Sequence, residues 1–297
     1  MASDRASIDP NRTFLDKLRD RDSIRYTDFN YPFLIAQTGA AVQVPVADLA
    51  EWVRVYLKNG KLPLPSHFNT SNKGVINLDL PEPIRTGKQL EAINECKENK
   101  CLMKMHTTLE KKVMEGASNK LKTFQDLLNK RLDNYHKKRE LLGYEDRTDD
   151  VEYVKKMLES FNFFSLRYPE LGKYFSGQFW TGEGPPTGFQ TSFMKQEVVN
   201  LAPDKMQPIW RVAEAFEFKL EGRWVFFEIH VYSNHYLDSS IRIYEVFPDG
   251  QRSIVVLTDV MEIDELTKSG LIRMLYKGKM EEAVIEAQAQ DMKALLK

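Results

Sequence analysis

The strand-rich block in the second half of the chain is the feature that most limits the fold. After a Gly/Pro cluster at residues 182–188, which is a turn signal, the sequence reads as a series of strands up to about residue 259. Two short turns, Glu221-Gly222 and Pro248-Asp249-Gly250, separate consecutive strands. Because turns this short join neighbouring strands as hairpins, the sequence predicts an antiparallel sheet.

The C-terminal segment has the apolar spacing of a helix. Residues 264–297 predict one long amphipathic helix or a broken pair, since Gly278 permits a kink. The predicted apolar stripe comprises Ile272, Tyr276, Met280, Val284 and Ala287. Together, these segments predict an α+β fold in which a curved antiparallel sheet packs on a long C-terminal helix.

The first half of the chain supplies an opening unit and a helical insertion. Residues 1–30 read as a short helix and a connector, and residues 31–297 as a single α+β domain with a helical insertion at about 87–176. The opening unit combines a strand over residues 41–46 with a helix that Asp48 can cap and that stops at Gly60. The buried face predicted for this helix comprises Leu49, Trp52, Val53 and Tyr56. Within the insertion, apolar residues recur at helical spacing over residues 119–144 and 149–168.

Composition argues against two classes of protein. The 42 Lys and Arg residues nearly balance the 43 Asp and Glu residues, whereas nucleic-acid-binding proteins usually carry a clear basic excess. No stretch approaches the ~18 consecutive apolar residues that a membrane-spanning helix requires. The first residues are polar and carry no signal-peptide core, so the compartment has to be inferred from the cysteines.

The chain contains two cysteines, Cys96 and Cys101, in the polar segment NECKENKCLM. We expect a local disulfide that closes a short, solvent-facing loop. Such bridges persist in oxidising compartments, so this interpretation predicts a periplasmic or secreted protein. Two alternatives remain open: a pair of unrelated reduced thiols, and a metal site that also uses His106. The metal site lacks a visible fourth ligand, which structural zinc requires.

Two resemblances add to this interpretation. Without the insertion, the order strand, helix, antiparallel strands and long C-terminal helix resembles the helix-grip arrangement of START-like lipid-transfer domains. That resemblance implies a cavity between the sheet and the helix, although a fold alone does not fix a function. A family of uncharacterised secreted proteins of Gram-negative bacteria resembles the chain at the segments VQVPVADLAEWV, CKENKCLMKM, YPELGKYFSGQFW and SNHYLDSSIRI. This second resemblance implies an extracytoplasmic location and carries no known activity with it.

The strand region over residues 223–247 combines aromatic and polar side chains with two of the five histidines. Period-two alternation puts one set on a common face: Phe226, Glu228, His230, Tyr232, Asn234 and Tyr236. Aromatic side chains with a few polar groups are typical of the wall of a ligand cavity. The residues between them, from Val225 to Leu237, form a nearly apolar face that we expect in the core. A bend near Asn234 would redirect His235, and Asp238 could then orient one imidazole.

The sequence therefore predicts a protein that binds a lipid or another hydrophobic small molecule without chemistry. The predicted ligand-binding residues are Phe226, His230, Tyr232, Asn234, His235, Tyr236, Asp238, Tyr276 and Met280. We expect no cofactor and no metal, because neither a G-x-S-x-G nor an H-E-x-x-H motif nor a phosphate-binding glycine loop is present. We expect no nucleic-acid partner, because the charge is nearly balanced.

Two other functions remain open. One is a hydrolase or isomerase that uses His230 or His235 with Asp238 as a general base. The other is a structural or adaptor protein of the cell envelope. Residues 104–140 contain ten Lys or Arg against five Asp or Glu. This basic segment is either a solvated helix face or a peripheral contact for an anionic membrane or an envelope protein.

Overall fold

The structure, a computed structural model, describes residue 18 and residues 23–30, 33–59, 79–98, 100–105, 108–138, 189–199, 207, 209–220, 222–235, 237–263, 266 and 270–297. Several predicted features lie outside these residues. They are most of the N-terminal helix, the second helix of the insertion, the Gly/Pro cluster and the position of His106.

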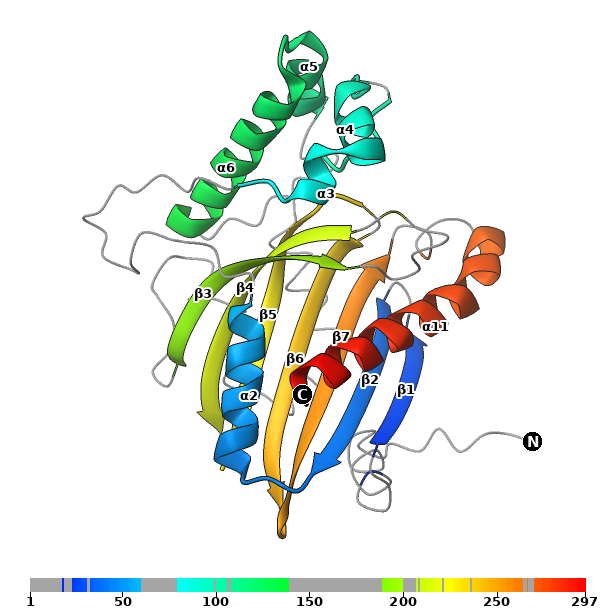
Figure 1. The fold of residues 1–297 in the computed structure, drawn as a ribbon. Helices are drawn as coiled ribbons and strands as arrows, with labels where there is room; N and C mark the ends of the chain where they lie inside the picture. The colour runs from blue at the N-terminus through cyan, green and yellow to red at the C-terminus, as the bar shows by residue number, and fades with distance from the viewer. Residues whose placement is uncertain are drawn as a thin grey trace. The chain divides into compact units, whose positions relative to one another are not determined.

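Seven strands form one curved, open antiparallel sheet in the order β1-β2-β7-β6-β5-β4-β3 (Figure 1). The strands are β1 (Ser23–Asn30), β2 (Phe33–Val42), β3 (Phe189–Val199), β4 (Ile209–Leu220), β5 (Arg223–Ser233), β6 (Leu237–Asp249) and β7 (Arg252–Ile263). Both predicted hairpin turns are confirmed. Gly222 and Gly250 adopt φ angles of 82° and 63°, left-handed conformations that glycine accepts most readily. The predicted α+β class is confirmed.

The chain divides into two compact units. Unit 1 comprises Met1–Asn59, Ala215–Glu228 and Ser240–Lys297. Unit 2 comprises Gly60–Glu214 and Ile229–Ser239. The predicted domain boundaries stay a prediction.

The beginning of unit 1 differs from the expected connector, strand and helix. Ser23–Asn30, predicted as a connector, forms β1 and pairs with β2 from Ser23↔Ala40 to Asn30↔Phe33. Its side chains are mostly exposed, so the apolar alternation that marks a half-buried strand is absent. β2 ends at Val42, and helix α2 (Val46–Lys58) begins after Pro45 at the N-cap position. The predicted cap, Asp48, lies instead in the first turn, where its carboxylate interacts favourably with the helix dipole.

The buried face of α2 agrees with the sequence only in part. Leu49, Ala50, Val53 and Leu57 are buried. Trp52 is 37% exposed, so its predicted burial is wrong. Ala50 and Leu57, which the sequence did not assign to this face, are buried instead.

In unit 1, side chains are buried on both faces of the sheet. On one face, Leu18 packs against Ile254 and Val256 of β7. The other face includes Ala36 and Asp259, which are directly paired across β2 and β7. This second face meets the C-terminal helix α11 (Gly270–Leu295), because the Gln288 side chain donates a hydrogen bond to the Ala36 carbonyl at 3.1 Å.

Helix α11 is one long helix, the first of the two arrangements that the sequence left open (Figure 1). Three residues of the predicted stripe are buried: Met280, Val284 and Ala287. Tyr276 is 41% exposed, so its predicted inward position is wrong. Leu271 and Met274 are also exposed, which shows that burial begins farther along the helix. Apolar periodicity identifies a helix face but does not tell where a neighbouring element starts to cover it.

Unit 2 contains the described part of the helical insertion. Its helices are α3 (Glu82–Arg85), α4 (Gly87–Asn94), α5 (Thr108–Gly116) and α6 (Lys120–Lys138). The predicted stripe of α6 is largely confirmed, since Phe124, Leu128, Leu132 and Tyr135 are buried. Tyr135 also donates a hydrogen bond from its hydroxyl to Glu214 of β4 at 2.7 Å.

Candidate functional site

Asn234, directly after β5, forms hydrogen bonds with two other segments of unit 2. Its side-chain oxygen accepts a hydrogen bond from the Trp210 backbone N–H at 2.7 Å, and its own N–H donates to the Trp210 carbonyl at 3.0 Å. Its carbonyl accepts from the Lys104 N–H at 3.0 Å. Asn234 is fully buried, so these bonds satisfy polar groups that have no access to water.

His235 is bonded to a residue that the sequence did not indicate. Its Nε2 atom lies 2.9 Å from Oε1 of Gln89 in α4, an oxygen that also accepts from the Asn234 amide at 3.2 Å. Burial is the main cause that lowers the pKa of His235 to about 4, so the imidazole is neutral near pH 7. The side chain of Asp238 and the whole of Tyr236 lie outside the described residues. The predicted His-Asp pair therefore stays a prediction.

Tyr232 and His230, two predicted wall residues, lie in unit 2. The Tyr232 ring contacts Phe124 and Trp210 edge to face, with centroid distances of 6.4 and 5.6 Å. Its hydroxyl donates to the Lys104 carbonyl at 3.1 Å. Burial, followed by the charges of Arg211, Lys104 and Arg131, holds the pKa of His230 well below its usual value. Helix α11 belongs to unit 1, so a cavity between α11 and these two residues stays a prediction.

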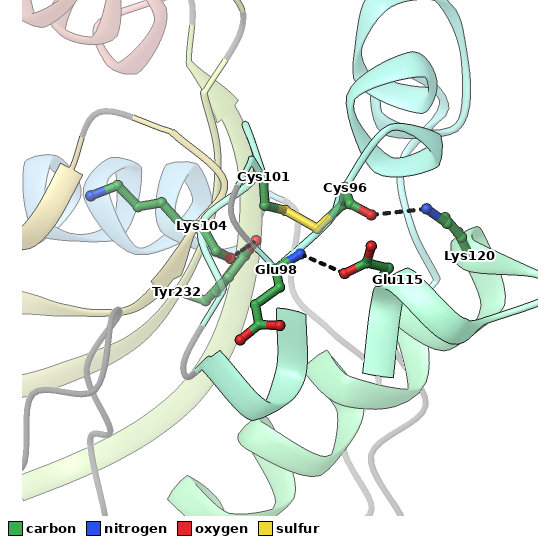
Figure 2. Close-up of a disulfide and its surroundings, with 7 residues drawn as sticks. All are labelled: Cys96, Glu98, Cys101, Lys104, Glu115, Lys120 and Tyr232. Atoms are coloured by element: carbon green, nitrogen blue, oxygen red, sulfur yellow. Dashed lines mark hydrogen bonds between the residues drawn. A yellow bond between two sulfur atoms is a disulfide. The ribbon is translucent and has the colours of Figure 1, made fainter. Parts of the chain in front are cut away.

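The predicted disulfide between Cys96 and Cys101 is present (Figure 2). It closes a loop that is bonded to the neighbouring helices. Lys120 Nζ donates to the Cys96 carbonyl at 2.8 Å, and the Glu98 N–H donates to Glu115 Oε2 at 3.1 Å (Figure 2). Cys96 is fully buried, so the loop is less exposed than expected. Lys104, whose backbone is hydrogen-bonded to Asn234 and Tyr232, lies shortly after Cys101 in the chain. The disulfide thus restrains the segment that holds the end of β5.

A second polar cluster lies in unit 1, between the sheet and α11, and is centred on Arg242 of β6. The Arg242 guanidinium donates two hydrogen bonds to Asp259 of β7, at 2.7 and 3.0 Å, and a third to Asp291 of α11 at 2.7 Å. Burial opposes the charge of Arg242. The carboxylates of Asp259 and Asp291 outweigh that effect and keep its pKa well above the usual value. Asp291 also accepts from the Tyr56 hydroxyl of α2 at 2.8 Å.

Gln288 extends this cluster to β2. Its side-chain oxygen accepts from the Thr38 hydroxyl at 2.8 Å. Its amide nitrogen donates to the Ala36 carbonyl at 3.1 Å and to Asp259 at 2.9 Å. The side chains of Gln288, Thr38 and Asp259 are all buried, so polar contacts attach α11 to the sheet next to the predicted apolar stripe.

Two buried hydroxyls on β6 have no hydrogen-bond partner among the described residues: those of Tyr244 and Ser240. Alternation along the strand puts them on the same face as Arg242, toward α11. The Tyr244 ring lies edge to face against Tyr56, with centroids 6.3 Å apart. Burial is the main cause that raises the pKa of Tyr244 well above its usual value, so the phenol keeps its proton. Native structures rarely leave such groups unsatisfied without a reason.

The remaining predicted ligand residues fall in different surroundings. Phe226 is buried beneath the Arg54 guanidinium of α2, which lies 5.9 Å from the ring centroid and pairs with Glu217. Met280 is buried on α11, and Tyr276 is exposed. The sequence did offer one sign of the Arg242 cluster, since Ser240, Arg242 and Tyr244 alternate with isoleucines. It offered no sign of the distant partners in α11.

No protein-family model matches the chain, and no curated protein sequence does. Among solved structures, the chain is similar to the protein TTHA0849 from Thermus thermophilus, with 18% sequence identity and a TM-score of 0.27. The match covers 49% of this chain and 89% of that chain. A likeness this weak carries no argument about fold or function, so the START-like and secreted-family resemblances stay predictions. Within the described ranges, no helix is long and apolar enough to cross a membrane. The same ranges contain no metal-binding group of three or more His, Cys, Asp or Glu side chains.

Proposed function

We propose that the protein binds a lipid or another hydrophobic small molecule, without chemistry, between α11 and the sheet of unit 1. The observation that carries this proposal is the pair of buried β6 hydroxyls, Tyr244 and Ser240, without a described partner. A buried hydroxyl without a hydrogen bond costs roughly 1–3 kcal/mol. A ligand with one polar group would satisfy such a hydroxyl and recover that free energy.

The residues around the two hydroxyls supply the apolar surface that such a ligand needs. On the α11-facing side of β2 and β7, paired positions carry mostly apolar side chains: Leu34, Met261, Leu257, Ala40 and Val255. Helix α11 contributes Met280, Ala283, Val284 and Ala287, all buried. Mostly apolar walls with a few placed polar groups are typical of small-molecule sites. Small alanines leave volume, and a flexible methionine adapts to ligand shape.

The disulfide supports an extracytoplasmic location for this activity, since such bonds persist in oxidising compartments. We propose a periplasmic or secreted protein. Peripheral contact of the basic insertion with a membrane or an envelope protein stays a prediction.

The test is to fill the proposed volume. Ala287→Trp should abolish co-purified lipid, because Ala287 lies on the buried stripe of α11. Its stability should fall by less than the ~1–3 kcal/mol that overpacking a solid core costs. Ala294→Trp is the matched control, since Ala294 is exposed on the same helix. Lipid is extracted from protein purified from its native host and identified by mass spectrometry, and thermal unfolding is followed in parallel.

Two results would overturn the proposal. The first is wild-type protein from which no lipid can be extracted and to which none can be added back. The second is an Ala287→Trp protein that loses stability clearly while its bound lipid is unchanged, because the helix would then pack on a solid core.

A further inference from the structure

We infer that the polar group of the ligand is an uncharged oxygen, a hydroxyl or a carbonyl, and not a carboxylate or phosphate. This inference rests on the proposed function and names its ligand class: a single-chain lipid with a neutral head group that bonds the Tyr244 hydroxyl. It follows from the charge of the Arg242 cluster and from the hydrogen-bonding capacity of the two β6 hydroxyls.

The Arg242 cluster has more acid than base. The three described hydrogen bonds of its guanidinium all end on carboxylates, two on Asp259 and one on Asp291. One guanidinium thus faces two carboxylates, and these three side chains together carry a net charge of −1. The charges that act on the Tyr244 phenol are those of Arg242, Glu228 and Asp291, again with more acid than base.

An anionic head group would therefore enter a buried site that is already negative. Arg242 and Asp259 are 5% and 1% exposed and Asp291 is 25% exposed, so water screens the charge of this cluster only in part. A guanidinium already held by two carboxylates also has less attraction left for a third. A fatty acid or a phospholipid should bind about tenfold more weakly, or worse, than a neutral lipid of the same chain length.

A neutral oxygen matches what the site offers. Tyr and Ser hydroxyls can each donate one hydrogen bond and accept others. A ligand carbonyl would accept from the Tyr244 hydroxyl, and a ligand hydroxyl could either donate to it or accept from it. Ser240 and Tyr244 are four positions apart, about 13 Å along β6. A single ligand oxygen that bonds Tyr244 therefore cannot also bond Ser240.

The first arm of the test compares two matched probes, dodecan-1-ol and dodecanoate, titrated calorimetrically into delipidated full-length protein at pH 8. We expect dodecan-1-ol to bind at least about tenfold more tightly. Tyr244→Phe removes only the hydroxyl and should weaken dodecan-1-ol binding about threefold to tenfold while leaving the folded protein as stable or more stable. Ser240→Ala should leave this affinity within about twofold.

The second arm changes the charge. Asp291→Asn keeps the shape of the side chain and removes one negative charge, so it should narrow the preference for the alcohol over the carboxylate. Dodecanoate binding as tightly as dodecan-1-ol to wild type would overturn the neutral-head-group inference and leave lipid binding standing. An alcohol affinity unchanged in Tyr244→Phe would overturn the assignment of Tyr244. Failure of both probes and of extracted host lipid to bind would instead overturn the proposed function itself.

Discussion

Replacing Gln288 by methionine removes the polar attachment of α11 to β2 and β7 while keeping the length of the side chain. Methionine and glutamine have similar helix propensities, so the helix itself should be unaffected. The wild-type amide makes three hydrogen bonds, to Thr38, Ala36 and Asp259, and its side chain has no exposure to solvent. The substitution therefore tests the buried contacts alone.

The expected loss of stability follows from these three bonds. Each contributes about 0.5–1.5 kcal/mol, and a buried group left without a partner costs roughly 1–3 kcal/mol. The Ala36 carbonyl and the Thr38 hydroxyl would lose this partner, whereas Asp259 would keep the two hydrogen bonds of Arg242. We expect the free energy of unfolding to fall by about 2–4 kcal/mol. For a chain of this size, that corresponds to a fall of about 3–6 °C in Tm.

Guanidinium denaturation followed by tryptophan fluorescence would measure this change, with Gln290→Met as the matched control. Gln290 is exposed on the same helix, and its replacement should change stability by less than about 0.5 kcal/mol. If both variants lose the same small amount, the polar cluster does not hold α11, and the reasoning that places buried polar contacts between helix and sheet fails.

Two further predictions concern unit 2. Intact mass after thiol alkylation should show Cys96 and Cys101 unmodified in protein exported to an oxidising compartment, and two alkylated cysteines would contradict this. Replacing both by serine should lower the free energy of unfolding by at most ~3 kcal/mol, because the closed loop is short. The folded-state pKa of His235, about 4, lies below the 6.5 of the unfolded chain, so its stabilisation is complete above pH 6.5 and is lost as pH falls toward 4. The free energy of unfolding should therefore decrease as the pH is lowered from 7.5 to 5, and His235→Asn should make this decrease smaller by roughly 1–2 kcal/mol. Identical pH dependence in the two proteins would contradict the burial of a neutral His235.

The features that the sequence predicted correctly are those encoded by local pattern. Short turns with glycine separate strands that the structure pairs, and the spacing of Met280, Val284 and Ala287 marks a helix face that the structure buries. Cys96 and Cys101 are close enough in the chain for their pairing to follow from proximity. Each of these inferences depends on residues only a few positions apart.

The candidate site could not be predicted in the same way, because its partners are distant in sequence. Gln288 binds Thr38 across 250 positions, and His235 binds Gln89 across 146. Alternation in β5 also failed to distinguish a ligand wall from a core, since Phe226 and Phe227 on opposite faces are both buried. A period-two pattern distinguishes a buried face from a solvated one only where one face meets solvent. In β5, both faces are buried from residue 225 to residue 233.

Strand β1 determines which strand lies at the edge of the sheet. β2 reads FLIAQTGAAV, ten residues without a charge, and would be the edge of the sheet if β1 were removed. An uncharged, apolar edge strand is a template for pairing with another chain. β1 covers that edge along eight residue pairs and presents Arg25 and Asp28 outward as exposed, opposite charges. The segment that the sequence predicted as a connector thus puts a strand with exposed charges, in place of an uncharged one, at this edge of the sheet.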